Sequence, residues 1–424
     1  MLEINFIEAN QEHVINLLTS RQLKNAAELV AHAITINKER KITQQAYDLV
    51  ASKAKEVSKE IEQLLKTGQK DAAEARKADS MQFKDALKKL DTGLKQHQKD
   101  LQETLYNIPN LPHAGTPIGK DEQDNKIISE VKPLPTAAAN TLPHWELIEK
   151  YDLIDFKLGN QLAGAGFPVY KGKGARLQRA LINFFLDEAR AAGFEEIQPP
   201  ILTNATSAYA TGQLPDKEGQ MYQLAGEDLY LIPTAETPIT NLYRGKILPK
   251  QTIPIQHVAY TPCFRREAGS WGKDVRGLNR LHQFDKVELV VITLPSLSYP
   301  TLETMRQYVE GLVTKLALPY RVLSLCTGDL GFTSAATYDI EVFSIGQDRW
   351  LEVSSISNFE TYQTHRMQTR YKEADGTTHL LHSLNGSALA LPRIMAALLE
   401  LNYDGDKITM PKILTKYLDF ECIR

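Results

Sequence analysis

The sequence is poor in cysteine, in long apolar runs and in net charge. Its three cysteines, Cys263, Cys326 and Cys422, form no CxxC pair and have no metal-ligand spacing. We therefore expect neither a disulfide framework nor a structural zinc site. No apolar run approaches the length of a membrane span. The opening residues are mixed and acidic, unlike those of a signal peptide, so we expect a cytoplasmic protein.

Charge is nearly balanced over the 424 residues, whose net charge is -3. A global basic field of the kind that attracts nucleic acid is therefore absent. The stretch from Lys24 to Glu103 nevertheless holds 16 Lys and Arg against 13 Asp and Glu. Solvated flanks of long helices account for most of these charges. The alternative is that some of the lysines contact phosphates.

Two stretches near the N-terminus space their seam residues by alternating steps of four and three. The first runs from Ile36 to Leu64 and the second from Phe83 to Leu101, and residues 67–70 between them fit a tight turn. This spacing predicts two long helices, over about residues 28–105, folded back on each other as an antiparallel coiled coil.

The length predicts two or three domains. We expect an N-terminal domain over residues 1–110, an irregular linker rich in Pro and Gly over 111–143, and an α+β domain over 144–424. In that last domain, strand-like and helix-like segments do not alternate regularly, which favours a mostly antiparallel sheet flanked by helices. The helix-like segments are Arg176–Ala192, Thr301–Leu316 and Pro392–Leu401, and the strand-like ones are Ile255–Phe264, Gln283–Thr293, Tyr338–Phe343 and Trp350–Ser355.

The most informative segment runs from Thr261 to Glu288 and predicts a strand, a glycine-rich loop and a second strand. Because side chains alternate between the faces of a strand, one surface would collect two arginines, an aromatic ring and two carboxylates. Arginine holds phosphate or carboxylate, and a carboxylate accepts from an amine. Such a surface suits an adenine nucleotide together with a zwitterion, although a charged hairpin exposed to water has the same composition. The residues on this face are Arg265, Glu267, Arg280, His282, Phe284, Lys286 and Glu288.

The string FRREAGSWGKDVRGLNRLHQFDKVEL, from Phe264 to Leu289, resembles motif 2 of class II aminoacyl-tRNA synthetases in its seryl-tRNA synthetase form. Gly193–Pro200, after an amphipathic helix, resembles motif 1, and Asn385–Glu400 resembles motif 3. Taken singly, these two would read as an ordinary helix–turn–strand and an amphipathic core helix. Two shorter segments resemble the serine-binding and ATP-holding segments of seryl enzymes, and they are Thr234-Ala235-Glu236 and Glu352-Val353-Ser354-Ser355.

The resemblance implies a role for each matching residue. The residues implied in catalysis are Arg265, Glu267 and Arg393. Those implied in ATP binding are Arg265, Arg266, Glu267, Arg280, Phe284, Glu352, Val353, Ser354, Ser355 and Arg393. Those implied in serine binding are Thr234, Ala235, Glu236, Arg265, Glu288, Asn385 and Ser387, with either Glu236 or Glu288 holding the ammonium group. Mg²⁺ that accompanies ATP would be held by Glu352 and Ser355, whose opposite strand parity requires a bulge or bend between them.

The resemblance also implies the reaction and the partners. A seryl enzyme forms seryl-adenylate from L-serine and ATP and passes serine to the 3′ end of tRNA(Ser); tRNA(Sec) stays open as a second acceptor. The helical arm would bind that tRNA through phosphates, and motif 1 would build a homodimer. Candidate phosphate contacts on the outer faces of the arm are Lys53, Lys55, Lys84 and Lys88. The alternatives are an enzyme that charges a carrier protein, another class II specificity such as threonine, and a non-enzymatic binding module.

Overall fold

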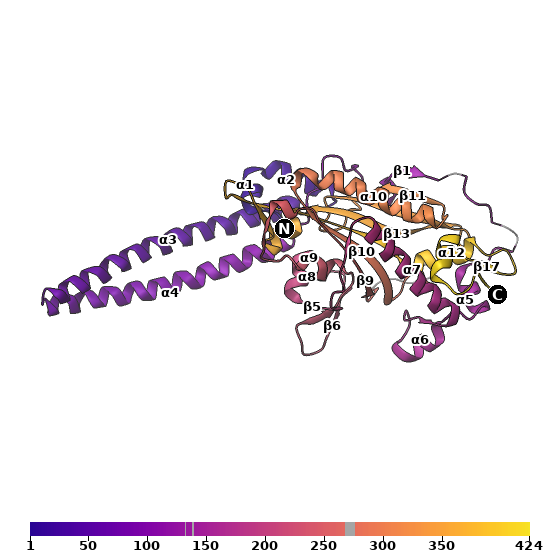
Figure 1. Cartoon of the computed structure of the whole chain (residues 1–424). Coiled ribbons are helices and arrows are strands. Elements are labelled where there is room, and N and C mark those ends of the chain that lie inside the picture. The colour runs from indigo at the N-terminus through magenta and orange to yellow at the C-terminus, as the bar shows by residue number, and fades with distance from the viewer. Residues whose placement is uncertain (132, 138–139, 268–275) are drawn as a thin grey trace. The chain divides into compact units, whose positions relative to one another are not determined.

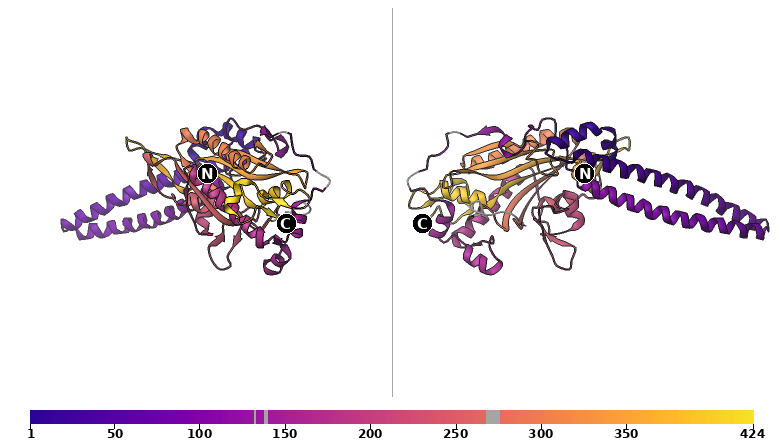
Figure 2. Two further views of the ribbon diagram at one scale, coloured as in Figure 1. Left: turned by 45° about the vertical axis from the view of Figure 1, so that its right-hand side comes forward. Right: turned by 180° about the vertical axis from the view of Figure 1, so that it is seen from behind.

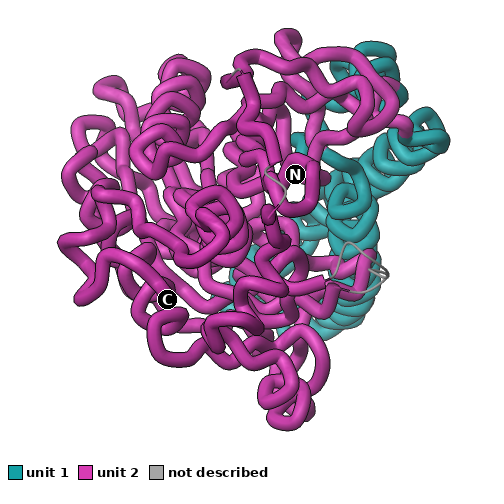
Figure 3. Tube along the Cα trace, turned by 90° about the vertical axis from the view of Figure 1, so that its right-hand side faces the viewer, with its two compact units in different colours: residues 1–19, 23–109 teal, residues 20–22, 110–424 magenta. Residues whose placement is uncertain are grey.

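The computed structural model describes residues 1–131, 133–137, 140–267 and 276–424. Internal contacts divide the chain into two compact units, shown in separate colours in Figure 3. Unit 1 comprises residues 1–19 and 23–109, and unit 2 comprises residues 20–22 and 110–424. None of the helices in the described part of the chain is both long and apolar enough to cross a bilayer.

Unit 1 is helical, and its main feature is a hairpin of two long helices. Helix α3 (Ala26–Lys66) has 41 residues and α4 (Lys70–Tyr106) has 37. The two helices run side by side in Figure 1 and in both views of Figure 2. Gly68 lies in the turn between them with a φ of 76°, a left-handed conformation that glycine adopts without strain.

The predicted heptad seam of the hairpin is confirmed. Ile36, Val57, Leu94 and Leu101 are buried, and the other predicted seam residues are half-buried. The short helices α1 (Ile4–Ala9) and α2 (Gln11–Ser20) precede the hairpin. The base of α3 is tied to α1, because the fully buried Asn37 donates to the Glu8 Oε1 atom over 2.7 Å.

Unit 2 is built on an eight-stranded sheet with the order β1-β11-β12-β13-β16-β10-β9-β4. Every neighbouring pair is antiparallel except β4 and β9, so the predicted antiparallel character is confirmed. The strands are β1 (Lys126–Glu130), β4 (Glu195–Glu196), β9 (Ile255–Phe264), β10 (Gln283–Thr293), β11 (Tyr320–Ser324), β12 (Ala336–Ser344), β13 (Arg349–Glu360) and β16 (His382–Ala390). Both β9 and β10 coincide with their predicted limits, while β12 and β13 extend beyond theirs.

Three helices cover one face of this sheet, and they are α7 (Gly172–Ala191), α10 (Ser298–Lys315) and α12 (Leu391–Leu401). Apolar residues from all three helices join alternate residues of β10 and β16 in the largest core cluster. Val287 and Leu289 of β10 and Leu384 and Ala388 of β16 point into it. The residues between them therefore face the opposite side, which these helices leave uncovered.

The prediction of an irregular linker over residues 111–143 is wrong at strand β1. Residues 126–130 pair with β11 at the edge of the large sheet. The strand is only five residues long. So short an apolar run is not recognisable as a strand among the surrounding Pro and Gly residues.

Smaller elements complete unit 2. The remaining α-helices of the described residues are α5 (His144–Lys150), α6 (Phe156–Ala163), α8 (Ala205–Thr211), α9 (Glu236–Asn241) and α11 (Tyr362–Met367). The remaining strands are β2 (Ile154–Asp155), β3 (Val169–Tyr170), β5 (Leu202–Asn204), β6 (Tyr222–Gln223), β7 (Leu229–Leu231), β8 (Ile247–Pro249), β14 (Arg370–Lys372), β15 (Thr378–Leu380), β17 (Ile408–Thr409) and β18 (Cys422–Ile423).

Candidate active site

The uncovered face of the sheet forms the floor of a cavity of about 600 Å³. Most of the site residues expected from the sequence line it, although they come from segments far apart in the chain. These residues are Thr234, Glu236, Arg265, Glu267, Arg280, Phe284, Glu288, Glu352, Val353, Ser355, Asn385, Ser387 and Arg393.

Three of the expected residues do not line the cavity. Ala235 is fully buried, and Ser354 is buried with its hydroxyl donating to the Ser387 carbonyl. Arg266 is exposed. The rest of the motif 2 loop, residues 268–275, lies outside the described residues.

Within β10 the predicted alternation holds. Phe284, Lys286 and Glu288 face the cavity, whereas Asp285 on the other face accepts hydrogen bonds from Gln178 and Tyr260.

The alternation of side chains does not continue into the segment between the strands, because β9 ends at Phe264 and β10 begins at Gln283. Glu267 has a φ of 48°, so its approach to the cavity does not follow from strand parity. The prediction that His282 shares the ligand face is wrong. Its ring contacts the Tyr222 hydroxyl instead, because the backbone is not yet in the strand.

A β-bulge brings Glu352 and Ser355 to the same cavity. Opposite β13, Ile340 pairs with Ser354, and the next residue, Glu341, pairs with Glu352. The extra residue on β13 changes the parity of the strand between Glu352 and Ser355. The bend expected from the sequence is therefore confirmed.

A buried group of polar side chains surrounds Glu288, which is 1% exposed. Its carboxylate accepts from Asn385 Nδ2 over 3.0 Å and from Ser387 Oγ over 3.2 Å, and it forms an ion pair with Lys286. Lys286 also donates to Thr234 Oγ1 over 2.9 Å. Sequence reasoning assigned Lys286 to this face but gave it no role; its strand parity with Glu288 was the available signal.

The second buried carboxyl of the site, Glu236, begins α9 and is 6% exposed. The pKa of Glu236 is raised to about 7, mainly by burial and also by the nearby charge of Glu288, although the hydrogen bond from Gln363 and the charge of Lys286 lower it. Gln363 Nε2 donates to Glu236 Oε1 over 2.6 Å and is itself oriented by Ser383. Nothing in the sequence pattern indicated Gln363.

The arginines of the cavity are held by aromatic, acidic and backbone groups. The Arg265 guanidinium lies 5.2 Å from the centre of the Phe284 ring, a cation–π distance. Arg280 forms an ion pair with Glu267 over 3.0 Å. Arg393 occupies the first turn of α12, as expected, and donates to the Glu352 carbonyl over 2.7 Å.

The cavity also has a wall that sequence reasoning missed. It is the loop after α8, together with Phe332 from the segment between β11 and β12, and it carries no periodic pattern that would mark it in the sequence. The loop residues that line the cavity include Gln213, Asp216, Lys217, Glu218 and Gln220.

Comparisons with known proteins identify this arrangement. The seryl-tRNA synthetase N-terminal domain family matches residues 1–112, and the class II core domain family of tRNA synthetases (G, H, P, S and T) matches residues 221–402. A serine–tRNA ligase of Salinibacter ruber is 44% identical over 422 residues, 99% of this chain and 98% of the relative. The chain belongs to the seryl-tRNA synthetase family.

Solved structures agree with this assignment. The seryl-tRNA synthetase of Pyrococcus horikoshii, complexed with ATP, has a TM-score of 0.92 and 30% identity, covering 100% of this chain and 99% of that one. The cytoplasmic serine–tRNA ligase of Naegleria fowleri, in complex with AMP, has a TM-score of 0.86 and 25% identity over the same shares. The class II fold expected from motifs 1 to 3, together with the N-terminal helical arm, is thus confirmed.

Proposed function

We propose that this member of the seryl-tRNA synthetase family activates L-serine with ATP and transfers the seryl group to the 3′ end of tRNA(Ser). The proposal depends on one observation, which is that a single cavity is lined by residues suited to an amino acid and by residues suited to a nucleotide. Buried carboxylates and hydroxyls suit a small polar amino acid, and arginines beside an aromatic ring suit a nucleotide.

Glu236 is the better acceptor for the serine ammonium group. Among the described residues, only Gln363 donates a hydrogen bond to its side chain. Glu288 already accepts from Lys286, Asn385 and Ser387. The group around Glu288 instead suits the serine hydroxyl, because alanine would leave these buried polar atoms without the partner that serine supplies.

Activation needs positioning and charge neutralisation rather than a protein nucleophile. A serine carboxylate oxygen attacks the α-phosphorus of ATP, and the bond to pyrophosphate breaks. Arg265 would neutralise charge on the α-phosphate and the carboxylate, and Arg393 would hold the terminal phosphate. Phe284 would stack on adenine, and Glu267 would accept from its amino group.

The donor set also fits Mg²⁺, a cation that prefers oxygen ligands. Glu352 and Ser355 would hold it, and the bulge that brings both to the cavity supports this fit. A further oxygen, the buried Asp339 Oδ1, has no hydrogen-bond partner among the described residues and lies on the residue paired with Ser355. When bound, the ion neutralises phosphate charge.

The α3–α4 hairpin would bind tRNA(Ser), and tRNA(Sec) is a second acceptor to be tested. Lys53, Lys55, Lys84 and Lys88 are exposed, as a phosphate-binding role requires. We also propose a homodimer, a cytoplasmic location, and a functional boundary near residue 110, with the catalytic domain over 144–424.

The test is amino-acid-dependent ATP–pyrophosphate exchange, followed by charging of tRNA(Ser) transcripts. Exchange with serine and not with threonine or alanine is the expected result. Exchange with threonine would indicate another class II specificity, and exchange with serine without tRNA charging would favour a carrier protein as acceptor. Absence of exchange with any amino acid would indicate a binding module.

A further inference from the structure

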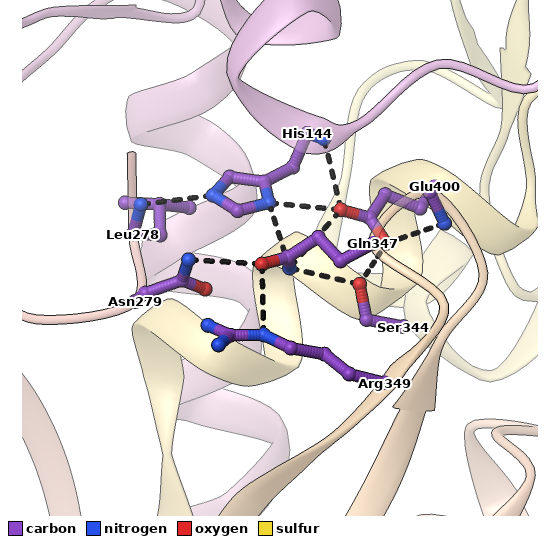
Figure 4. A network of polar contacts seen from close by, with 8 residues as sticks. His144, Leu278, Asn279, Ser344, Gln347, Arg349 and Glu400 are labelled. Atoms are coloured by element: carbon purple, nitrogen blue, oxygen red, sulfur yellow. Dashed lines mark hydrogen bonds and ion pairs between the residues drawn. The ribbon is translucent and has the colours of Figure 1, made fainter. Parts of the chain in front are cut away.

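Figure 4 shows a buried polar network that includes Leu278 and Asn279, two residues that line the cavity. Its centre is a pair formed by His144, the first residue of α5, and Glu400, near the end of α12. Both side chains are 0% exposed, so neither can contact a substrate directly.

Glu400 acts as the acceptor of this network. One carboxylate oxygen, Oε1, accepts from the His144 backbone N–H over 2.9 Å and lies 2.8 Å from the ring atom Nδ1. The other, Oε2, accepts from the Ser344 hydroxyl and from the Gly346 N–H. Gln347 Nε2 also donates to Oε1 over a longer 3.5 Å, so every contact on the two oxygens comes from a donor, as suits a carboxylate, which can only accept.

The partners of His144 determine its tautomer. Its Nε2 atom accepts from the Leu278 backbone N–H over 2.9 Å, so Nε2 carries no proton. The ring proton then lies on Nδ1 and is donated to Glu400. The imidazole, held at both ring nitrogens, thus links the Glu400 carboxylate to the backbone N–H of Leu278.

The segment that receives this contact lines the cavity. Residues 278–281 lead from the motif 2 loop into β10, and all four are part of the lining. Leu278 and Asn279 are almost fully buried, while Arg280 reaches Glu267. Gly277 permits the close approach, because a Cβ there would lie 2.4 Å from His144 Nε2.

The same segment is also held by Arg393 and by Gln347. Arg393 Nε donates to the Asn279 carbonyl over 3.2 Å, and Asn279 Nδ2 donates to Gln347 Oε1 over 2.9 Å. Gln347 in turn donates to Ser344, which belongs to the Glu400 network. Arg393 and Glu400 are seven residues apart on α12, about two turns, and therefore lie on one face of that helix.

We propose that His144 and Glu400 are positioning residues for the nucleotide half of the site. They hold the amide of Leu278 so that the Asn279 carbonyl meets Arg393 and Arg280 meets Glu267. This inference rests on the proposed function, because it assigns the residues around 278–281 to ATP. If the pair only stabilised the fold, its loss would weaken the binding of ATP and of serine equally. If it positions the nucleotide half of the site, its loss weakens ATP binding more than serine binding.

The experiment compares full-length wild type with His144→Leu, which loses both ring contacts, and His144→Gln, which keeps an acceptor near Leu278. His382→Leu is the matched control, since His382 is a buried histidine at the start of β16 that bonds Ser298 and does not line the cavity. Calorimetry measures the Kd of ATP, exchange assays measure the KM of ATP and of serine, and thermal melting reports folding.

We expect His144→Leu to weaken ATP binding about tenfold or more, because small misplacements of binding groups have effects of this order. The KM of serine stays within about twofold, and His144→Gln recovers part of the ATP affinity. An unchanged Kd of ATP in folded His144→Leu, equal losses for both substrates, or the same loss in His382→Leu would overturn the inference. If His144→Leu does not fold, the half-buried Gln347→Ala decides, with several-fold weaker ATP binding expected and no change contradicting the inference. Wild type that binds ATP but does not exchange with serine would contradict the proposed function instead.

Discussion

The hairpin and the cavity differ in how sequence leads to structure. In the hairpin, contacts repeat every three or four residues, and each helix needs only its neighbour to bury a thin seam. In the cavity, residues 234 and 393 belong to one site, although 159 positions separate them in the chain. A regular local repeat therefore describes the first region, while the second depends on strand order, a bulge and loops that leave the extended register.

This contrast predicts that single side chains matter most in the cavity. Arg265→Ala is expected to lower serine-dependent pyrophosphate exchange by about 10³-fold, because it removes a preorganised charge at the reacting groups. The measurement is exchange at saturating substrates, with thermal melting to confirm folding. Arg370→Ala, on β14 and outside the cavity lining, is the control. Near-normal exchange in folded Arg265→Ala would remove Arg265 from the mechanism.

The hairpin is expected to separate from the chemistry as a whole. Thr43 and Gly93 are neighbours across the seam, since a Cβ at Gly93 would lie 3.9 Å from the Thr43 Cγ2 atom. Deleting residues 44–92 and joining the ends keeps the buried base around Asn37. We expect normal pyrophosphate exchange but tRNA charging lowered by about 10²-fold or more, the loss expected when several phosphate contacts go together. Equal loss of both activities would show that the hairpin supports catalysis itself.

The buried carboxyl of Glu236 predicts that the KM of serine, a property of the cavity and not of the hairpin, depends on pH. A pKa of about 7 leaves Glu236 mostly neutral at pH 6 and mostly ionised at pH 8. Only the ionised form pairs with an ammonium group, so the KM of serine is expected to fall about tenfold between these pH values. Steady-state exchange measures this fall, and Glu236→Gln is expected to have a high, pH-independent KM. A flat profile in the wild type would assign the ammonium group to Glu288.

The smallest effects are expected for single lysines of the hairpin. Each phosphate contact that is lost lowers the slope of log affinity against log salt by somewhat less than one unit. We would measure tRNA binding over a salt series for a quadruple alanine variant of Lys53, Lys55, Lys84 and Lys88. The KM of serine is expected to stay unchanged.

A matched control for this experiment exists on the same helices. Three other exposed lysines form ion pairs within their own helix, which offsets their charge. They are Lys66, Lys77 and Lys95, paired with Glu62, Glu74 and Asp91. The control is a triple alanine variant of these three lysines. If the slope of log affinity against log salt is unchanged in the quadruple variant, or changes equally in the triple variant, the four candidates are only solvated side chains.

Prediction from sequence succeeded where chemistry or periodicity is local. The heptad spacing located α3 and α4 to within a few residues, and apolar β-branched runs located β9 and β10. Parity within β10 placed Phe284 and Glu288 on one face. The requirement for a bend between Glu352 and Ser355 was also correct, since strand geometry allows no other way for both to reach the cavity.

It failed where the backbone leaves regular structure. His282 turns to Tyr222, because the strand starts one residue later. The edge strand at residues 126–130 is too short to stand out among its Pro and Gly neighbours.

The sequence by itself determined the helical hairpin, the antiparallel sheet and the motif residues that face the cavity, because each follows from a repeat or a chemical pattern within a short stretch. Only the tertiary structure decided which distant groups meet. Gln363 orients Glu236, Lys286 joins Glu288 to Thr234, and His144 with Glu400 holds the amide of Leu278. These partners share no periodicity with the residues they hold. Their selection follows from burial, which leaves each polar atom only those hydrogen-bond partners that the packed fold brings within reach.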